Sequence, residues 1–284
     1  MNRNLYRQVS NGLARVFVYG TALAALIPLG LVLAYTVSKG LPSVENVDFF
    51  INSFRPIGIP GGGVAHALAG TVIMVGLASL LAVPVGILSG VYLVEYGRGR
   101  WGDLIRLASD VLVGAPSIAI GLFAYALLVA PFHHFSGISA AVALAVLMLP
   151  VVIRTTEGAI ELIPGSLREA GLALGLARWR VALQLIVPAA APGIVTGALL
   201  AVARAAGETA PLLFTAFGNQ ILNLDPSKPM AALPLLVFNY ARQPYPQAQQ
   251  QAWGAALVLV VLVLITNLTS RFVLRRQIAL ASKL

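Results

Sequence analysis

An all-α, polytopic membrane protein is the fold class that this sequence predicts, because the chain is too apolar for an ordinary soluble domain. Its mean hydropathy is +0.87 and 10% of its 284 residues are charged, whereas soluble chains carry about 25% charged residues. Apolar runs of about 20 residues, as helices, cross the roughly 30 Å hydrocarbon core of a bilayer. We expect about six such helices, at residues 14–37, 67–94, 105–130, 139–160, 190–216 and 252–273.

The six runs are expected to form one membrane-embedded domain over residues 1–284. The first run is too long for a removable signal peptide and has no small-residue cleavage site, so we interpret it as a retained helix. The third and fourth runs carry Arg, Asp or Glu near their ends, which leaves their boundaries soft. Two outer loops, at about 39–64 and 218–251, are rich in residues that favour turns and irregular backbone.

The net charge of +9 predicts an orientation rather than a nucleic-acid partner. With both termini on the cytoplasmic side, 14 Lys and Arg residues fall on inner segments and 4 on outer ones. The inner residues are Arg3, Arg7, Arg15, Arg98, Arg100, Arg106, Arg154, Arg168, Arg178, Arg180, Arg271, Arg275, Arg276 and Lys283, and the outer residues are Lys39, Arg55, Lys228 and Arg242. The positive-inside rule therefore predicts two cytoplasmic termini, with a smaller attraction to anionic lipid.

Metal and disulfide chemistry find little support in the sequence. The chain has no cysteine, which excludes disulfides and thiolate metal sites. His133 and His134 mark a short outer turn, where we interpret them as solvated interfacial residues because no further ligands stand nearby. Asp110, in the inner half of the third run, either forms packing hydrogen bonds between helices or lines a pathway.

A charged, amphipathic inner segment at about 162–188 lies between two apolar runs. It reads Glu169-Ala170-Gly171, three residues, Gly175, nine residues, then Leu185-Ile186-Val187-Pro188. Leu167, Ala170 and Leu174 share one helical face, and Gly175 suits the end of that short helix, where a positive φ is needed. A second short helix with Trp179, Ala182, Leu183 and Ile186 on one side is expected to end at Pro188. The segment either lies on the bilayer surface or docks against a protein in the cytoplasm.

A charged pair interrupts the fifth apolar run. Arg204 and Glu208 are four residues apart and share a helical face, and Thr209 follows them directly. An Arg in the middle of a membrane helix costs about 2.5–3.5 kcal/mol on insertion scales. The pair either neutralises itself locally or faces a translocation pathway. A guanidinium donates paired hydrogen bonds to an oxyanion such as phosphate, and a neighbouring carboxylate would weaken that grip and permit release.

The spacing of the inner segment resembles the loop that permeases of ATP-binding-cassette importers use to contact their ATPase. Glu169, Ala170, Gly175 and Pro188 match that loop in register, while Gly171 replaces an alanine. The resemblance implies that the segment forms coupling helices that dock in a groove of the ATPase. It also implies that Glu169 caps or pairs within the loop and that Gly175 permits a sharp bend.

A second resemblance covers nearly the whole chain. Arg204 to Leu212 reads Arg-Ala-Ala-Gly-Glu-Thr-Ala-Pro-Leu, which looks like the phosphate permeases of the PstA type, and Gly114-Ala115-Pro116-Ser117-Ile118 also fits. The resemblance implies the type I importer fold in a bacterial inner membrane. It further implies a second permease of the PstC type, an ATPase dimer of the PstB type and an extracytoplasmic phosphate-binding protein of the PstS type.

The function that these features predict is the permease subunit of an ATP-driven phosphate importer. The chain has no Gly-rich P-loop, so we expect no enzyme activity and no cofactor in this chain, with ATP and magnesium bound by the partner ATPase. A permease for another oxyanion, such as molybdate or sulfate, is the nearest alternative. A secondary transporter or channel is a different class, which needs no docking loop and usually shows inverted repeats. A membrane scaffold without transport is a third.

Overall fold

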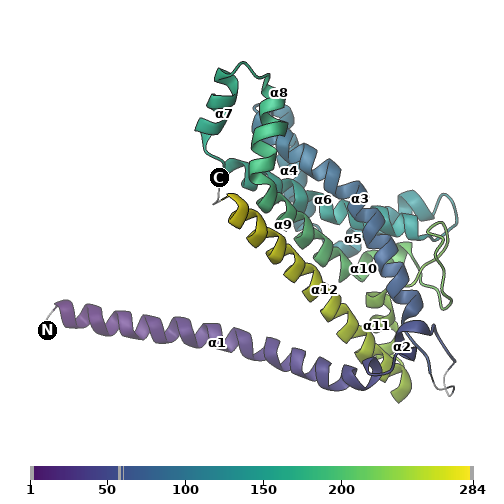
Figure 1. The fold of residues 1–284 in the computed structure, drawn as a ribbon. Helices are drawn as coiled ribbons and strands as arrows, with labels where there is room; N and C mark the ends of the chain where they lie inside the picture. Colours follow the sequence, from purple (N-terminus) through teal and green to yellow (C-terminus); the bar gives the residue numbers. More distant parts are fainter. Residues whose placement is uncertain (1–2, 57–58, 60, 282–284) are drawn as a thin grey trace.

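The structure is a computed structural model that describes residues 3–56, 59 and 61–281; Lys283 of the expected inner charges lies outside them. The described residues form helices and no strand, apart from one isolated bridge between Phe217 and Met230 (Figure 1). In chain order the elements are α1 Arg3–Val44, α2 Asp48–Ile51, α3 Ala65–Glu95, α4 Arg100–Gly114, α5 Ser117–Ala124, a π turn η1 Tyr125–Val129, α6 Gly137–Glu161, α7 Gly165–Ala173, α8 Arg178–Val181, a π turn η2 Ala182–Ile186, α9 Val187–Ala206, α10 Ala210–Thr215, α11 Leu233–Ala241 and α12 Pro246–Ala281.

The expected all-α membrane fold is confirmed, with one of the spans broken. By length and apolar composition, five helices of the described chain are able to cross a membrane: Ser10–Val44, Ala65–Glu95, Gly137–Glu161, Arg178–Ala206 and Pro246–Thr269. A sixth span arises if Arg100–Gly114 and Ser117–Val129, which meet at 107°, are counted together.

The run expected at 105–130 is therefore divided into two helices, and proline explains the break. Ala115 has an extended backbone with ψ 134°, and Pro116 follows it with ψ 133° before α5 begins. A residue before proline is pushed out of the helical region by the proline ring. The run is apolar enough for one span, but Pro116 divides it into two half-helices.

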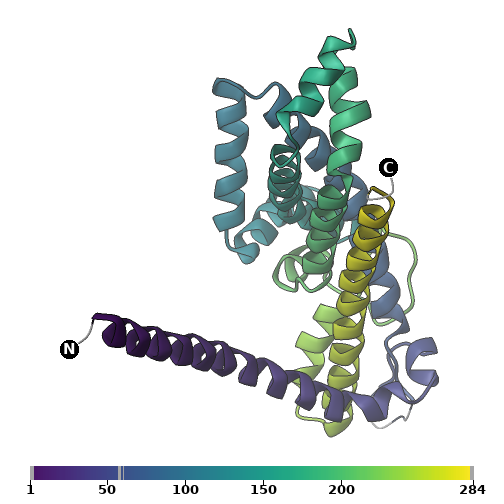
Figure 2. The same ribbon diagram turned by 60° about the vertical axis from the view of Figure 1, so that its left-hand side comes forward.

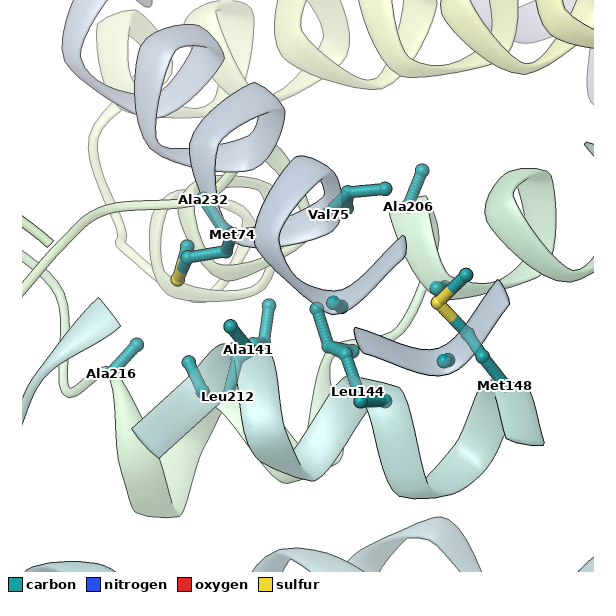
Figure 3. Packing of buried hydrophobic residues seen from close by; sticks show 14 of the residues in the cluster. Met74, Val75, Ala141, Leu144, Met148, Ala206, Leu212, Ala216 and Ala232 are labelled. Atoms are coloured by element: carbon teal, nitrogen blue, oxygen red, sulfur yellow. The ribbon is translucent and has the colours of Figure 1, made fainter. Parts of the chain in front are cut away.

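The core of the bundle lies where α3 packs against α6. Met74 and Val75 of α3 meet Leu144 and Met148 of α6, and Leu212 of α10 completes this cluster (Figure 3). Many of the remaining buried residues of the cluster are alanines. Lipid gives helices no hydrophobic reason to associate, so membrane helices rely on small residues that allow close van der Waals packing.

Two glycines bring α3 and α6 closest together. A Cβ atom placed on Gly86 would lie 2.7 Å from Val152 Cβ, and one on Gly90 would lie 2.6 Å from Thr156 Cβ. Real Cβ atoms do not approach so closely, and therefore only glycine fits at these positions. The result is a tightly joined helix pair in the centre of the molecule.

Helix α1 extends away from the rest of the molecule in both views of the ribbon (Figures 1 and 2). It contacts α12 near its own C-terminal end, where the rings of Tyr35 and Trp253 meet edge to face at 5.1 Å between centroids. The amide of Gln250 also donates to the carbonyl of Lys39 at 2.8 Å. Closer to the N-terminus of α1, apolar side chains such as Phe17 and Leu26 are exposed.

Candidate functional site

The segment 162–188 forms two short helices joined by a tight turn at one end of the bundle, which we call the α7 end (Figure 1). Helix α7 ends in a Schellman motif. Gly175, with φ +76°, donates its N–H to the carbonyl of Leu172 at 3.0 Å, and Leu176 donates to the carbonyl of Gly171 at 3.3 Å. The expected positive φ at Gly175 is confirmed, and the bend satisfies helix-end carbonyls that would otherwise lack partners.

Pro188 does not end the second helix, contrary to the sequence expectation. The helical backbone runs without a break from Arg178 through Pro188 to Ala206. The π turn η2 directly precedes the proline, and Val187 donates its N–H to the carbonyl of Ala182, five residues earlier. A proline ring clashes with the carbonyl four residues before it in an α-helix, and the wider π turn relieves that clash.

The two short helices bury one side and expose another. Gly171 of α7 is buried against Val181 and Leu185, because a Cβ at Gly171 would lie 2.8 Å from Leu185 Cδ1. This contact makes the two helices one packed unit. The predicted stripe is only partly right, since Leu167 packs inward whereas Ala170 is exposed.

An apolar surface remains exposed on this unit. It contains Leu172, Leu174, Trp179 and Leu183, and the exposed fraction reaches 80% at Leu174 and 52% at Trp179. Glu169 is also exposed and makes no hydrogen bond or ion pair with a described residue. The structure therefore gives no support to capping or pairing of Glu169 within the loop, and leaves this carboxylate available to an external partner.

A buried carboxylate that sequence reasoning missed holds the unit to the end of α3. Glu95, the last residue of α3, is 2% exposed. Arg168 of α7 donates from Nε to Glu95 Oε1 at 2.9 Å, and Arg178 of α8 places Nε 3.8 Å from Glu95 Oε2. The signal available in the sequence was an isolated Glu at the inner end of an otherwise apolar run.

A second missed cluster joins α4 to α6 at the same end of the bundle. Buried Glu157 accepts from Arg106 Nε at 2.7 Å and from Arg154 Nη1 at 3.0 Å. Arg154 also donates from Nε to Asp110 at 3.1 Å. Asp110 is thus a hydrogen-bonding residue between helices, which was one of its two expected roles.

The charged pair of the fifth run lies at a helix end rather than in mid-helix. Helix α9 ends at Ala206, and α10 begins at Ala210, so Arg204 occupies the last turn of α9 and Glu208 lies in the break. Pro211 has no N–H for a helical bond to Gly207, which favours this break. The run expected at 190–216 is therefore divided between α9 and α10.

Arg204 and Glu208 form a loose pair. Arg204 Nε lies 3.7 Å from Glu208 Oε1, beyond hydrogen-bond distance, and the side chains are 53% and 18% exposed. Thr209 caps α10 through its backbone position and makes no side-chain cap bond. The guanidinium therefore keeps donors free for another ligand.

The two helix breaks belong to packed neighbours. Helix α10 packs on α5, and a Cβ on Gly121 of α5 would lie 2.7 Å from Pro211 Cα. Two short helices, α5 directly after Pro116 and α10 with Pro211 as its second residue, thus lie in close contact. Irregular backbone at membrane depth is tolerated where it is buried in protein or lines a water-filled cavity.

A polar cavity of about 670 Å³ opens at the opposite end of the bundle, which we call the α11 end. Amide side chains and His66 line it together with a few apolar residues. Burial raises the pKa of Tyr240 in its wall to about 12. The lining residues are His66, Phe217, Gly218, Asn219, Gln220, Ile221, Ala231, Leu235, Leu236, Asn239, Tyr240 and Gln243.

His133 and His134 are exposed at the turn before α6, and within the described chain no group of three or more His, Asp or Glu residues is arranged to hold a metal ion.

The candidate site that the structure presents has two parts. One is the packed unit at 162–188 with its exposed apolar surface, and the other is the loosely paired Arg204 beside a helix break.

The sequence of this chain is similar to sequences of known membrane transport proteins. A family described as "Binding-protein-dependent transport system inner membrane component" matches residues 82–278. The phosphate transport system permease protein PstA of Yersinia pestis is 41% identical over 276 residues, which is 97% of this chain and 93% of the relative. The protein of the same name from Xylella fastidiosa strain Temecula1 is 45% identical over 245 residues, or 85% of this chain and 84% of the relative.

Solved structures resemble the fold at lower sequence identity. A chain of the inward-facing MetNI methionine ABC transporter has a TM-score of 0.59 at 20% identity and covers 76% of this chain and 94% of its own. A chain of a bacterial alginate ABC transporter, solved in complex with an alginate pentasaccharide-bound periplasmic protein, has a TM-score of 0.64 at 13% identity, with coverage of 94% and 96%.

Proposed function

Because the chain belongs to the family of binding-protein-dependent transport system inner membrane components, we propose that it is the permease subunit of an ATP-driven phosphate importer. The observation that carries the proposal is the similarity to phosphate permeases over almost the full length, at 41% identity over 97% of the chain. The loosely paired Arg204 supports it chemically, since an unsaturated guanidinium is a good phosphate ligand.

The packed unit at 162–188 is the contact for the ATPase subunit. Its exposed apolar residues, Leu174 and Trp179 among them, offer the kind of surface that protein interfaces bury. Its two helices are held together at Gly171, so the unit is able to pass on a rigid-body movement. The proposed contact with the ATPase includes Glu169, Ala170, Gly175 and Pro188. In this proposal Glu169 interacts with the ATPase and not with residues of its own loop.

Arg204 and Glu208, with Thr209, are proposed to line the substrate pathway. The break after Ala206 brings backbone groups and a charged side chain to membrane depth, which fits a water-filled route better than lipid. Phosphate binds the guanidinium, and Glu208, 3.7 Å from Arg204, competes for the same donors and promotes release. This competition keeps the affinity low enough for transport.

The proposed assembly contains four kinds of protein. A second permease of the PstC type completes the pore, an ATPase dimer of the PstB type binds ATP and magnesium, and a phosphate-binding protein of the PstS type delivers the anion at the α11 end. The α7 end faces the cytoplasm with both termini, in a bacterial inner membrane. The charge distribution of 14 inner against 4 outer Lys and Arg residues supports this orientation.

Phosphate uptake by the complete reconstituted complex tests the proposal at Arg204. We expect Arg204→Gln to lower ATP-dependent uptake by about tenfold to a hundredfold, which corresponds to the loss of one charge-assisted hydrogen-bonding group. Arg15→Gln is the matched control, because Arg15 lies on the exposed part of α1 and its loss should leave uptake unchanged. Unchanged uptake in Arg204→Gln would rule out the pathway role.

Competition between anions tests the substrate. In the same vesicles we expect unlabelled phosphate to suppress uptake of labelled phosphate, whereas equal concentrations of molybdate and sulfate should leave it nearly unaffected. Preferred uptake of molybdate or sulfate would instead identify an importer of another oxyanion.

A further inference from the structure

Glu95, at the end of α3, is contacted by charged side chains from both short helices of the unit 162–188. Arg168 of α7 donates from Nε to Glu95 Oε1 at 2.9 Å, and its Nη2 lies within ion-pair distance of the same oxygen, at 2.7 Å. Arg178 of α8 directs Nε at Oε2, at 3.8 Å, and its Nη2 donates to the backbone carbonyl of Glu95. The Arg178 guanidinium also lies 5.0 Å from the centre of the Tyr96 ring.

These contacts restrain the unit in more than one direction. Arg168 and Arg178 come from different helices, and they approach different oxygens of the same carboxylate. The unit is also continuous with α9 and shares an apolar cluster with α3. The contacts to Glu95 from two separate helices, together with the bond to its backbone carbonyl, add a polar connection that holds the unit against the end of α3.

A movement of the unit 162–188 that reaches Glu95 would pass along α3 to α6. Helix α3 is joined to α6 by the close contacts at Gly86 and Gly90, where a Cβ would lie 2.7 Å and 2.6 Å from side chains of α6. Packed helices at this density move together, because interiors respond by rigid shifts rather than by continuous deformation. A displacement of Glu95 therefore displaces the central helix pair.

A contribution to stability does not explain why a glutamate occupies position 95. A carboxylate in the last turn of a helix opposes the helix dipole, and at 2% exposure it has lost its hydration. Buried ion pairs are often no more stabilising than apolar residues of similar size. A residue that is locally unfavourable, yet held by two arginines from the docking unit, indicates a role in which the connection itself matters.

We propose that Glu95 is a positioning residue that couples movement of the docking unit 162–188 to α3, and through α3 to the translocation pathway. This inference rests on the proposed function, because it requires that an ATPase moves the unit. Arg168 and Arg178 are its two partners in this connection. The exposed apolar residues proposed for docking belong to the unit, whereas Glu95 belongs to α3.

The test compares transport with ATP hydrolysis in the complete complex reconstituted with its binding protein. In Glu95→Gln we expect the ATPase subunits to co-purify as with the wild type and ATP hydrolysis to continue. The amount of phosphate taken up per ATP should fall about tenfold. Glu161→Gln is the matched control, because Glu161 ends α6 at the same end of the bundle and is exposed, and it should keep the wild-type ratio.

A double-mutant cycle separates coupling from general damage. Arg168→Gln should lower phosphate uptake per ATP about threefold, and adding it to Glu95→Gln should lower the ratio no further, since both act on one connection. If Glu95→Gln fails to assemble, the Arg168→Gln ratio decides the proposal alone. An unchanged ratio in whichever of these variants assembles would overturn it.

A distance measurement gives a readout independent of transport. The chain has no cysteine, so spin labels at Ser166→Cys on α7 and Arg98→Cys just after α3 report the spacing of the two elements. We expect one narrow distance distribution that Glu95→Gln broadens; an equally narrow distribution in the variant would overturn the proposal. If wild-type complexes take up no phosphate, the proposed function fails, whereas normal wild-type uptake with an unaffected Glu95→Gln variant removes this inference alone.

Discussion

Gly175 has the strictest backbone requirement in the unit 162–188, because its φ of +76° lies in a region that costs other residues about 1–2 kcal/mol. No neighbouring atom lies within 4 Å of a Cβ placed there, so a substitution acts through the backbone alone. We expect Gly175→Ala to weaken retention of the ATPase subunit in a pull-down from detergent. Gly165→Ala is the control, since Gly165 is helical and also has open space beside it; equal retention in both variants would contradict this prediction.

Glu157 is the acidic residue on which the junction of α4 and α6 depends. It accepts from Arg106 at 2.7 Å and from Arg154 at 3.0 Å while its side chain is 7% exposed. Removing one partner of a fully buried ion pair costs about 3–5 kcal/mol, and the partial exposure of both arginines reduces that cost to roughly 1–3 kcal/mol. We expect Glu157→Gln to lower the thermal unfolding temperature of the purified complex.

The exposed acid Glu161, one turn further along α6, supplies the control for that measurement. Glu161→Gln should leave the unfolding temperature where it is, because surface substitutions away from special features usually change stability by less than about 0.5 kcal/mol. Equal unfolding temperatures for the two variants would mean that the Glu157 cluster contributes little to stability.

Some residues could be predicted from the sequence because their constraints are local. Gly175 was expected to have a positive φ since a glycine follows a short amphipathic helix, and the φ of +76° confirms this. Glu95 and Glu157 were not foreseen, because their partners Arg168 and Arg106 are 73 and 51 residues away in the sequence. Single residues show their charge in the sequence, but tertiary folding determines their partners.

At the scale of helices, the closeness of α3 and α6 is the feature that makes a rigid centre. We expect Gly90→Val to destabilise the protein by about 1–3 kcal/mol, the usual cost of overpacking, because a Cβ at Gly90 would lie 2.6 Å from Thr156 Cβ. Gly76→Val is the matched control on the same helix, since nothing lies within 4 Å of its Cβ position. Thermal unfolding of the two variants should differ clearly, and matching curves would refute the close contact.

Helix existence was predicted more reliably than helix continuity. Apolar runs are sufficient to indicate the spans, which explains the agreement for α3, α6 and α12. Proline has different effects in different surroundings: Pro116 separates two half-helices, Pro211 follows a break, and Pro188 is carried within a continuous helix after a π turn. The sequence shows each proline, but the packing around it determines whether the helix breaks.

At the scale of the whole molecule, the structure places the unit 162–188 and the cavity near His66 at opposite ends of the bundle. Single cysteines at Leu174, which is 80% exposed, and at Ile221, which is 74% exposed, test which end faces the cytoplasm. In vesicles stripped of the ATPase subunits, which would cover Leu174, we expect a membrane-impermeant maleimide to label Leu174→Cys when the vesicles are inside-out and Ile221→Cys when they are right-side-out. The reverse pattern would contradict the orientation that the positive charges predict.

The most direct test of the whole account is phosphate accumulation by vesicles that contain this chain together with the second permease, the ATPase dimer and the binding protein. We predict that labelled phosphate accumulates only when ATP is supplied on the side of the unit 162–188 and the binding protein is present on the other side. Accumulation that is independent of ATP, or driven by an ion gradient alone, would contradict the account.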